Sequence, residues 1–137
     1  MLGETYELVT DRLRFISEKI EHVPKQVVCF NMEGDGYEFN SYNNPDPKFK
    51  FNGGKGMIEF SQVGAYNIHM KKFDEHISVS KPKIQGKNII WGGIYFDIDG
   101  QIEALNHKTG EKVIIKFMGK SGDNKQLGKL EGKAYNS

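Results

Sequence analysis

The sequence has little of several features that would narrow its function. It has one cysteine, Cys29, among 137 residues, so no disulfide forms within the chain and a reducing compartment is expected. No run approaches the ~18 apolar residues of a membrane-spanning helix. The formal net charge of +1 disfavours a polyanionic partner such as duplex DNA. We therefore expect a soluble, cytoplasmic protein that does not bind nucleic acid.

Helical periodicity and catalytic motifs are also lacking. Residues 11–21 come nearest to a helical pattern but are better explained as extended chain. His69, His76 and His107 do not have the spacing of metal ligands, and the glycine of Asp97–Gly100 comes too early for a calcium loop. No nucleophile elbow or P-loop occurs. We expect no catalytic residue, no metal and no cofactor, and hence a protein that is not an enzyme.

What the sequence does contain is an alternation of apolar and polar residues, which is typical of strands with one dry and one wet face. Short alternating segments at intervals of about 8–12 residues indicate an all-β sandwich or barrel. The segments are 5–9, 13–16, 27–32, 36–42, 57–61, 66–70, 76–80, 87–91, 94–98, 101–106, 113–117 and 129–135. The pattern predicts one antiparallel meander.

Turn residues separate these segments. Glycine-containing turns are predicted at 34–36, 52–54, 99–100 and 108–110, because tight hairpins need a positive φ. Pro45 and Pro47 lack the N–H that a ladder requires, so residues 44–47 are not expected within a central strand.

The segment Phe15–Lys25, F-I-S-E-K-I-E-H-V-P-K, resembles the E-Q-V-S-H-H-P-P signature of the oxysterol-binding protein family. Glu18, His22 and Pro24 match the signature. Val23 stands in place of its second histidine, and Lys25 in place of its second proline.

Three further blocks resemble the family in the same order. Leu2–Glu4 is similar to the end of its N-P-x-L-G-E segment, Asn88–Gly92 to H-N-I-I-x-G, and Asn106–Lys112 to N-H-K-T-G-D-K. The resemblance implies a large, incomplete antiparallel β-barrel around a lipid tunnel. Residues 1–137 would form a single domain, partial relative to the family, without its lid and flanking helices.

The resemblance implies a lipid headgroup site at His22, Lys25 and Lys19, because the family's histidine pair holds a phosphoinositide phosphate at the tunnel mouth. Val23 donates no hydrogen bond and Glu21 repels an anion, so phosphoinositide binding is expected to be impaired. On residue types alone, the same charges fit a solvated loop between strands.

The resemblance also implies three tunnel residues. Asn43 lies in a segment similar to the family's G-Y-N, and Gln62 in one similar to Q-x-G; such inward polar groups serve a sterol hydroxyl. Asn43 could equally begin the Asn-Asn-Pro turn. Trp91 is expected in the core or the tunnel wall.

The resulting functional hypothesis is a module that binds or transfers a sterol-like or acyl lipid, with peripheral contact at organelle membranes. Basic residues could form a membrane-facing rim; these are Lys48, Lys50, Lys55, Lys71 and Lys72. The alternative is a protein-interaction or scaffold domain that pairs through exposed strand edges, as in a homodimer.

Overall fold

The computed structural model describes residues 1–51, 54–118 and 129–136. These residues form eleven β-strands and no helix. The strands are β1 (Thr5–Val9), β2 (Leu13–Glu21), β3 (Val27–Gly34), β4 (Tyr37–Lys50), β5 (Met57–Val63), β6 (Ala65–Met70), β7 (Glu75–Ser80), β8 (Lys83–Lys87), β9 (Tyr95–Asn106), β10 (Lys112–Met118) and β11 (Lys129–Tyr135). None of the described residues forms a helix with the length and hydropathy needed to span a bilayer.

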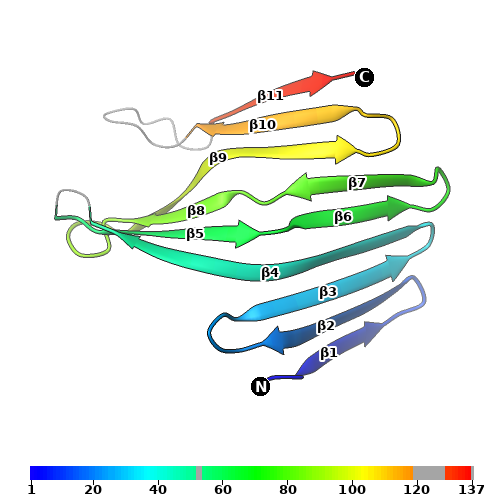
Figure 1. Cartoon of the computed structure of the whole chain (residues 1–137), viewed down its shortest axis with the longest axis horizontal. Coiled ribbons are helices and arrows are strands. Elements are labelled where there is room, and N and C mark those ends of the chain that lie inside the picture. The colour runs from blue at the N-terminus through cyan, green and yellow to red at the C-terminus, as the bar shows by residue number, and fades with distance from the viewer. Residues whose placement is uncertain (52–53, 119–128, 137) are drawn as a thin grey trace.

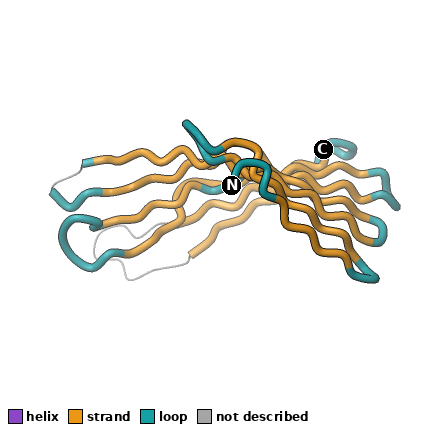
Figure 2. The backbone as a smooth tube through the Cα atoms, turned by 90° about the horizontal axis from the view of Figure 1, so that it is seen from below, coloured by secondary structure: helices purple, strands orange, loops and turns teal. Residues whose placement is uncertain are grey.

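All strand pairs are antiparallel and belong to one continuous sheet (Figure 1). The long strands β4 and β9 each change partner along their length: β4 pairs first with β6 and then with β5, and β9 first with β8 and then with β7. The second half of β4, β5, β8 and the first half of β9 therefore form a projecting part, which we call the small lobe. Seen from below (Figure 2), the strands bend between the small lobe and the rest of the sheet.

The strand register gives the large part of the sheet two different faces. One row of direct partners crosses six strands and is entirely apolar: Leu8, Phe15, Met32, Phe39, Ile68 and Ile77. The adjacent row points to the opposite face and contains Ile16, Asn31, Asn40, Asn67 and Ser78. Because neighbouring residues of a strand point to opposite faces, the sheet is apolar on one side and mostly polar on the other.

Aromatic rings reinforce the apolar face. Successive ring centroids are 6.1, 5.9, 5.1 and 5.9 Å apart along a chain of five rings that spans β1, β2, β3, β4 and β6. The rings belong to Tyr6, Phe15, Phe30, Phe39 and Tyr66. Cross-strand aromatic contacts of this kind stabilise a sheet.

A single layer of strands cannot bury both faces. Among the described residues Val27 alone is a buried hydrophobic residue, and the chain exposes 9750 Å². A compact monomer of 15.6 kDa exposes about 7,300 Å². The apolar face is therefore left open, and the described strands enclose no core of their own.

Eleven of the twelve predicted segments lie on strands, and two corrections concern the small lobe. The strand predicted at 87–91 is wrong: β8 is Lys83–Lys87, and Asn88, with a φ of 60°, begins a loop. Gly100, expected to end a strand, lies inside the continuous β9 with a φ of 90°. The turn expected at 52–54 falls partly outside the described residues.

Residues 44–47 were expected to separate two strands, and this is wrong because they continue β4; they lie at a local edge of the sheet and not in a central strand. Pro45 and Pro47 pair with Gln62 and Phe60 of β5. The two prolines are tolerated because β3 stops pairing with β4 after Asn43. Beyond that residue one side of β4 is a local edge, where no partner strand needs the N–H that proline lacks.

Candidate functional site

The signature segment forms the end of β2 and the turn into β3. Lys19 is half-buried on β2, whereas His22, Val23 and Lys25 are exposed in the turn, which contains a cis Val23–Pro24 bond. The backbone N–H of Gly3 donates to the carbonyl of Lys19 at 2.9 Å, and the N–H of Lys19 donates to the carbonyl of Glu4 at 3.1 Å. Two blocks that the sequence comparison singled out separately are thus adjacent in space.

A surface hollow of about 470 Å³ separates this turn from the local edge of β4. Its lining residues are Pro24, Lys25, Gln26, Pro45, Asp46, Pro47 and Phe60. The walls are mostly apolar, with one cation and one carboxylate, and Asp46 also forms an exposed ion pair with Lys48 at 3.4 Å. The hollow suits a molecule with an apolar body better than a multiply charged phosphate.

Asn43 and Gln62 point to the same face of the sheet. Gln62 pairs with Pro45, which lies two residues after Asn43 on β4. This is also the face of Phe39 and Ser41 on the same strand. The side chains expected in the tunnel therefore share the apolar face. Whether they contact a lipid stays a prediction.

Lys81 completes this region, although it was not among the predicted site residues. It is 8% exposed, and its Nζ donates to the Tyr42 carbonyl and, at 3.1 Å, to Asn43 Oδ1. The Nζ also lies 4.9 Å from the centre of the Tyr66 ring. Burial lowers the pKa of Lys81.

The position of Lys81 follows from the change of partner on β4. Ser41 is the last residue of β4 to pair with β6, and Asn44 is the first to pair with β5. Between them the Tyr42 carbonyl needs another donor, which Lys81 supplies from the junction of β7 and β8. Pro82 was the one available sequence signal, since it marks a strand interruption.

Trp91 lies apart from these residues. It is 74% exposed in the loop 88–94 at the end of the small lobe. The structure therefore groups Lys19, His22 and Lys25 in one hairpin and places Asn43 and Gln62 on neighbouring strands. The role of each in lipid binding remains a prediction.

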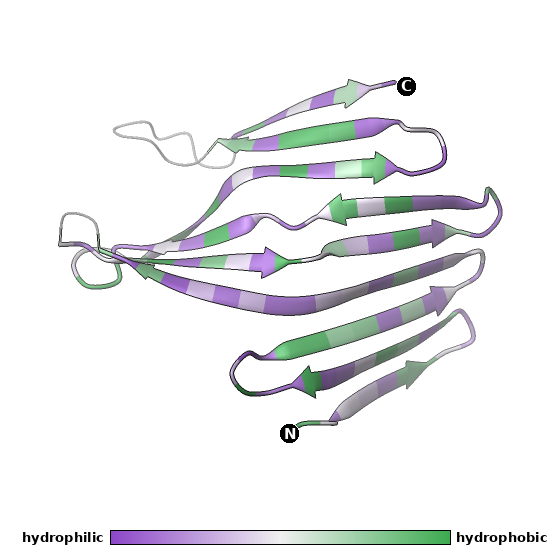
Figure 3. Ribbon diagram, viewed as in Figure 1, coloured by the Kyte–Doolittle hydropathy of each residue, from purple (hydrophilic) through white to green (hydrophobic). Residues whose placement is uncertain are grey.

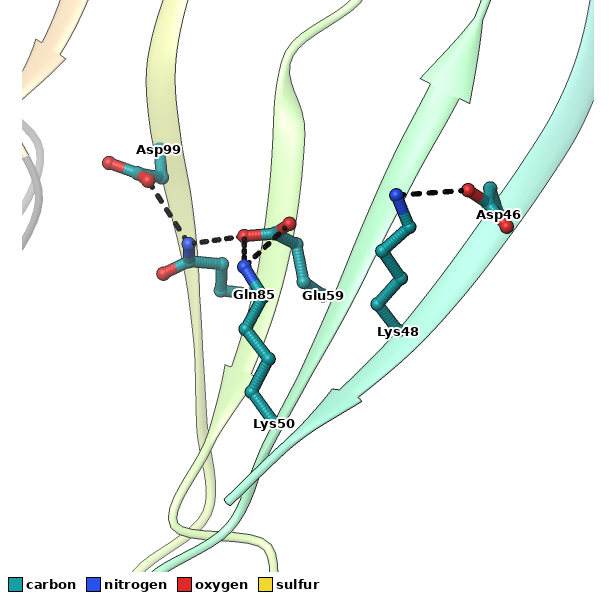
Figure 4. A network of polar contacts seen from close by, with 6 residues as sticks. All are labelled: Asp46, Lys48, Lys50, Glu59, Gln85 and Asp99. Carbon is teal, nitrogen blue, oxygen red and sulfur yellow. Dashed lines mark hydrogen bonds and ion pairs between the residues drawn. The ribbon is translucent and has the colours of Figure 1, made fainter. Parts of the chain in front are cut away.

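The opposite face of the small lobe carries a polar network (Figure 4). Lys50 Nζ donates to both carboxylate oxygens of Glu59 at 3.0 Å, and Gln85 Nε2 donates to Glu59 at 3.1 Å and to Asp99 at 3.0 Å. Glu59 and Gln85 are 6% and 7% exposed. The hydrogen bond from Lys50 is the main cause of the lowered pKa of Glu59. The network joins β4, β5, β8 and β9, and in it the Asp99 carboxylate accepts a hydrogen bond from the Gln85 amide.

The five lysines considered for a membrane rim do not gather in one place. Lys55 lies at the end of the small lobe. Lys71 lies in the β6–β7 turn at the other end of the sheet, where it pairs with Glu33 at 2.7 Å and Glu38 at 2.9 Å (Figure 1). Within the described ranges, no group of three or more histidine, cysteine or acidic residues could hold a metal ion.

The family model described as oxysterol-binding protein matches residues 1–137. The chain is 34% identical over 134 residues to human oxysterol-binding protein-related protein 2, covering 96% of this chain and 27% of that protein. It is 35% identical to rat oxysterol-binding protein-related protein 1, covering 96% of this chain and 14% of that protein. The chain belongs to the oxysterol-binding protein family.

Solved structures agree with this assignment. The crystal structure of the Osh3 ORD in complex with PI(4)P from Saccharomyces cerevisiae has a TM-score of 0.74 and 31% identity, covering 97% of this chain and 34% of that one. The Osh1 ORD domain in complex with cholesterol has a TM-score of 0.78 and 25% identity, covering 99% and 32%. The predicted fold class is thus confirmed as an all-β antiparallel sheet resembling these domains. The chain spans about a third of their length.

Proposed function

We propose that this chain is a lipid-binding module that takes up the apolar body of a sterol or related lipid on the uncovered face of its sheet. The observation that carries the proposal is the apolar row from Leu8 to Ile77, over which the described residues place no second layer. Each 100 Å² of apolar surface removed from water contributes about 2.5 kcal/mol. The solved relatives that hold cholesterol and ergosterol support a sterol-like ligand.

Polar side chains on the same face would orient the lipid. Asn43 Oδ1 already accepts from Lys81, so the Asn43 amide would present its Nδ2 donor to a lipid hydroxyl. Gln62 would supply a second amide. Because Lys81 occupies the oxygen of the Asn43 amide, only the NH₂ group is left for the ligand. A ligand group that accepts a hydrogen bond is therefore favoured over one that can only donate.

The phosphoinositide site is proposed to be impaired. Val23 is 78% exposed in the turn where a histidine would offer a hydrogen bond, and Asp46 shares the adjoining hollow with Lys25. A carboxylate beside the cation offsets its attraction for phosphate. The Osh3 relative binds PI(4)P, and this chain departs from the signature at the position of Val23.

The remaining attributes follow from the same proposal. Residues 1–137 would act as a single, non-enzymatic domain in the cytoplasm, in peripheral contact with membranes. We also propose that it transfers lipid between membranes, and the lipid-bound structures of its relatives support this.

Sterol binding can be measured by energy transfer from Trp91, the only tryptophan, to dehydroergosterol. Phe30→Ala should weaken binding by about tenfold, because burial of a large apolar side chain is worth about 1.5–3 kcal/mol. Ile16→Ala is the control: Ile16 is 41% exposed and lies on the opposite face. Thermal unfolding of both variants tests their folding. Equal affinity of folded Phe30→Ala and Ile16→Ala would refute the assignment of the face.

A specific feature of β11 supports a second candidate, self-association through a strand edge. All seven residues of Lys129–Tyr135 are exposed, and within the described part of the chain β11 pairs on one side only. Two antiparallel copies centred on Gly132 would place Glu131 opposite Lys133 twice. A chain that binds no sterol and elutes as a dimer in size-exclusion chromatography would favour this candidate over lipid binding.

A further inference from the structure

The end of the small lobe is built from two connections that bind each other. Residues 51 and 54–56 belong to the β4–β5 connection, and residues 88–94 join β8 to β9. The N–H of Ile89 donates to the Gly56 carbonyl at 3.3 Å, and the N–H of Ile90 donates to the Lys55 carbonyl at 3.1 Å. A Cβ on Gly56 would lie 2.8 Å from the Ile90 side chain, so the two segments are closely packed. We call this paired end, with Phe49 and Phe96 just behind it, the lobe tip.

The lobe tip exposes large apolar side chains, and the ring centroids of two of them, Phe49 and Phe51, are 6.1 Å apart. Their exposures run from 45% to 74% and belong to Phe49, Phe51, Ile90, Trp91, Ile94 and Phe96. The four aromatic side chains alone present roughly 400–700 Å², since each has about 150–250 Å² in total. Apolar patches of several hundred Å² on a folded protein usually mark an interaction surface.

An apolar row runs from the lobe tip into the small lobe. Phe49 pairs with Ile58, Ile58 with Gly86, and Gly86 with Phe96, so the four positions share one face. A Cβ on Gly86 would come within 3.0 Å of Ile58 and 3.2 Å of Phe96. Because Gly86 has no side chain, the side chains of Ile58 and Phe96 can approach each other across β8. The exposed residues of the lobe tip are therefore attached to paired strands.

The charges at the lobe tip are all positive. Residues 49–51, 54–58 and 86–96 include Lys50, Lys55 and Lys87 and contain no aspartate or glutamate. The first carboxylates, Glu59 and Asp97, lie behind this end, and they accept from Lys50 and Lys87. Lys55 sits on the β4–β5 connection itself and is exposed.

We propose that the lobe tip docks into the interface of an anionic lipid bilayer, with Trp91, Phe51 and Ile94 among the headgroups and Lys55 facing the charged surface. Tryptophan prefers the membrane–water interface because its ring is amphipathic. A second copy of this chain fits less well, since two lobe tips brought together would place lysines against lysines. An anionic surface complements both the charge and the hydropathy of the tip.

The location of the lobe tip agrees with a membrane partner. It lies at the same end of the sheet as the β2–β3 turn with His22 and Lys25 (Figure 1). Part of the β8–β9 loop is coloured as hydrophobic at that end in Figure 3. The turns of the opposite end carry mixed charges, with Lys71 paired to two glutamates. The proposal rests on the peripheral membrane contact proposed above and assigns it to one surface, and it is separate from lipid uptake because docking requires no lipid to enter the sheet.

The test uses the whole chain with phosphatidylcholine vesicles, with and without phosphatidylserine, and free of sterol and phosphoinositide. Vesicle flotation should show stronger binding when phosphatidylserine is present. The emission of Trp91 should move to shorter wavelength and become protected from acrylamide. Trp91→Ala should lower the vesicle partition coefficient by about tenfold or more, and Lys55→Glu should reduce the difference between the two vesicle types.

Phe73→Ala is the matched control, because Phe73 is 53% exposed in the β6–β7 turn at the opposite end. It should change vesicle partition by less than twofold, and circular dichroism of each variant verifies folding. Equal losses for Trp91→Ala and Phe73→Ala, or Trp91 emission that is unmoved by vesicles, would overturn the proposal. A shift of Trp91 emission that depends on protein concentration without vesicles would instead identify a second copy as the occupant. Dehydroergosterol binding without vesicles remains a separate measurement, so failure of docking and failure of lipid uptake are distinguishable.

Discussion

The charge of Glu59 should contribute measurably to the stability of the small lobe. Its carboxylate accepts two bonds from Lys50 and one from Gln85. Glu59→Gln keeps the size of the side chain and removes the charge. A hydrogen bond to a charged group contributes about 1.5–3 kcal/mol, but the Lys50 side chain is 49% exposed and can turn to water. Gln85 keeps its bond to Asp99. We therefore expect a loss of about 1–2 kcal/mol in the free energy of unfolding.

The effect should depend on pH in one direction. The pKa of Glu59 is lowered from its ordinary value of 4.5, chiefly by the hydrogen bond from Lys50. A carboxyl group with a lowered pKa stabilises the folded state above its ordinary pKa and loses that contribution as the pH falls. The difference in stability between the wild type and Glu59→Gln should therefore be full at pH 7 and shrink as the pH falls below 4.5.

Urea unfolding followed by circular dichroism measures this difference. Asp46→Asn is the control, because the Asp46–Lys48 pair lies in the same lobe with side chains that are 38% and 58% exposed (Figure 4). Exposed pairs contribute little, so this variant should unfold at the wild-type midpoint. The reasoning fails if both variants lose the same stability, or if the Glu59→Gln difference stays constant as the solution is acidified.

Two further predictions concern the backbone and the headgroup site. Gly64→Ala should be more destabilising than Gly100→Ala in thermal melts. Both glycines have a positive φ, of 98° and 90°, so the backbone cost of alanine is similar at the two positions. A Cβ at Gly64 would lie 2.6 Å from the Tyr42 ring, whereas a Cβ at Gly100 would have no atom within 4 Å. Equal melting points of the two variants would contradict this reasoning. Val23→His should raise phosphoinositide affinity by less than the roughly tenfold that one charge-assisted hydrogen bond supplies, because Asp46 remains in the hollow. A larger gain in a phosphoinositide titration would disprove the impairment.

The strands could be predicted from the sequence where apolar and polar residues alternate every second position. The segments 5–9 and 129–135 match β1 and β11 to the residue, because alternation and flanking turn residues agree there. The prediction failed at β8, whose sequence K-I-Q-G-K holds one apolar side chain and shows no clear period. It also failed at Pro45 and Pro47, because the end of β3, which exposes that side of β4, is a property of the sheet and not of the segment.

The candidate site was predictable only in part. Short blocks such as E-H-V-P-K marked the β2–β3 turn, since its residues are contiguous. Lys81 was not predicted, because its hydrogen bond to the Tyr42 carbonyl follows from the change of partner between Ser41 and Asn44 and not from its own segment. Trp91 was expected inside because of its apolar neighbours, yet a loop tip places such residues outward.

The exchange of partners along β4 and β9 makes the length of the projection independent of the rest of the molecule. Two residues added to each of β4, β5, β8 and β9 beyond the exchange would preserve which side chains face which way, since strand alternation repeats every two positions. Each such step would extend the projection by about 7 Å and leave the ladder from β1 to β3 untouched. How far the aromatic end stands out from the sheet could thus vary among related chains without altering the surface offered to a lipid.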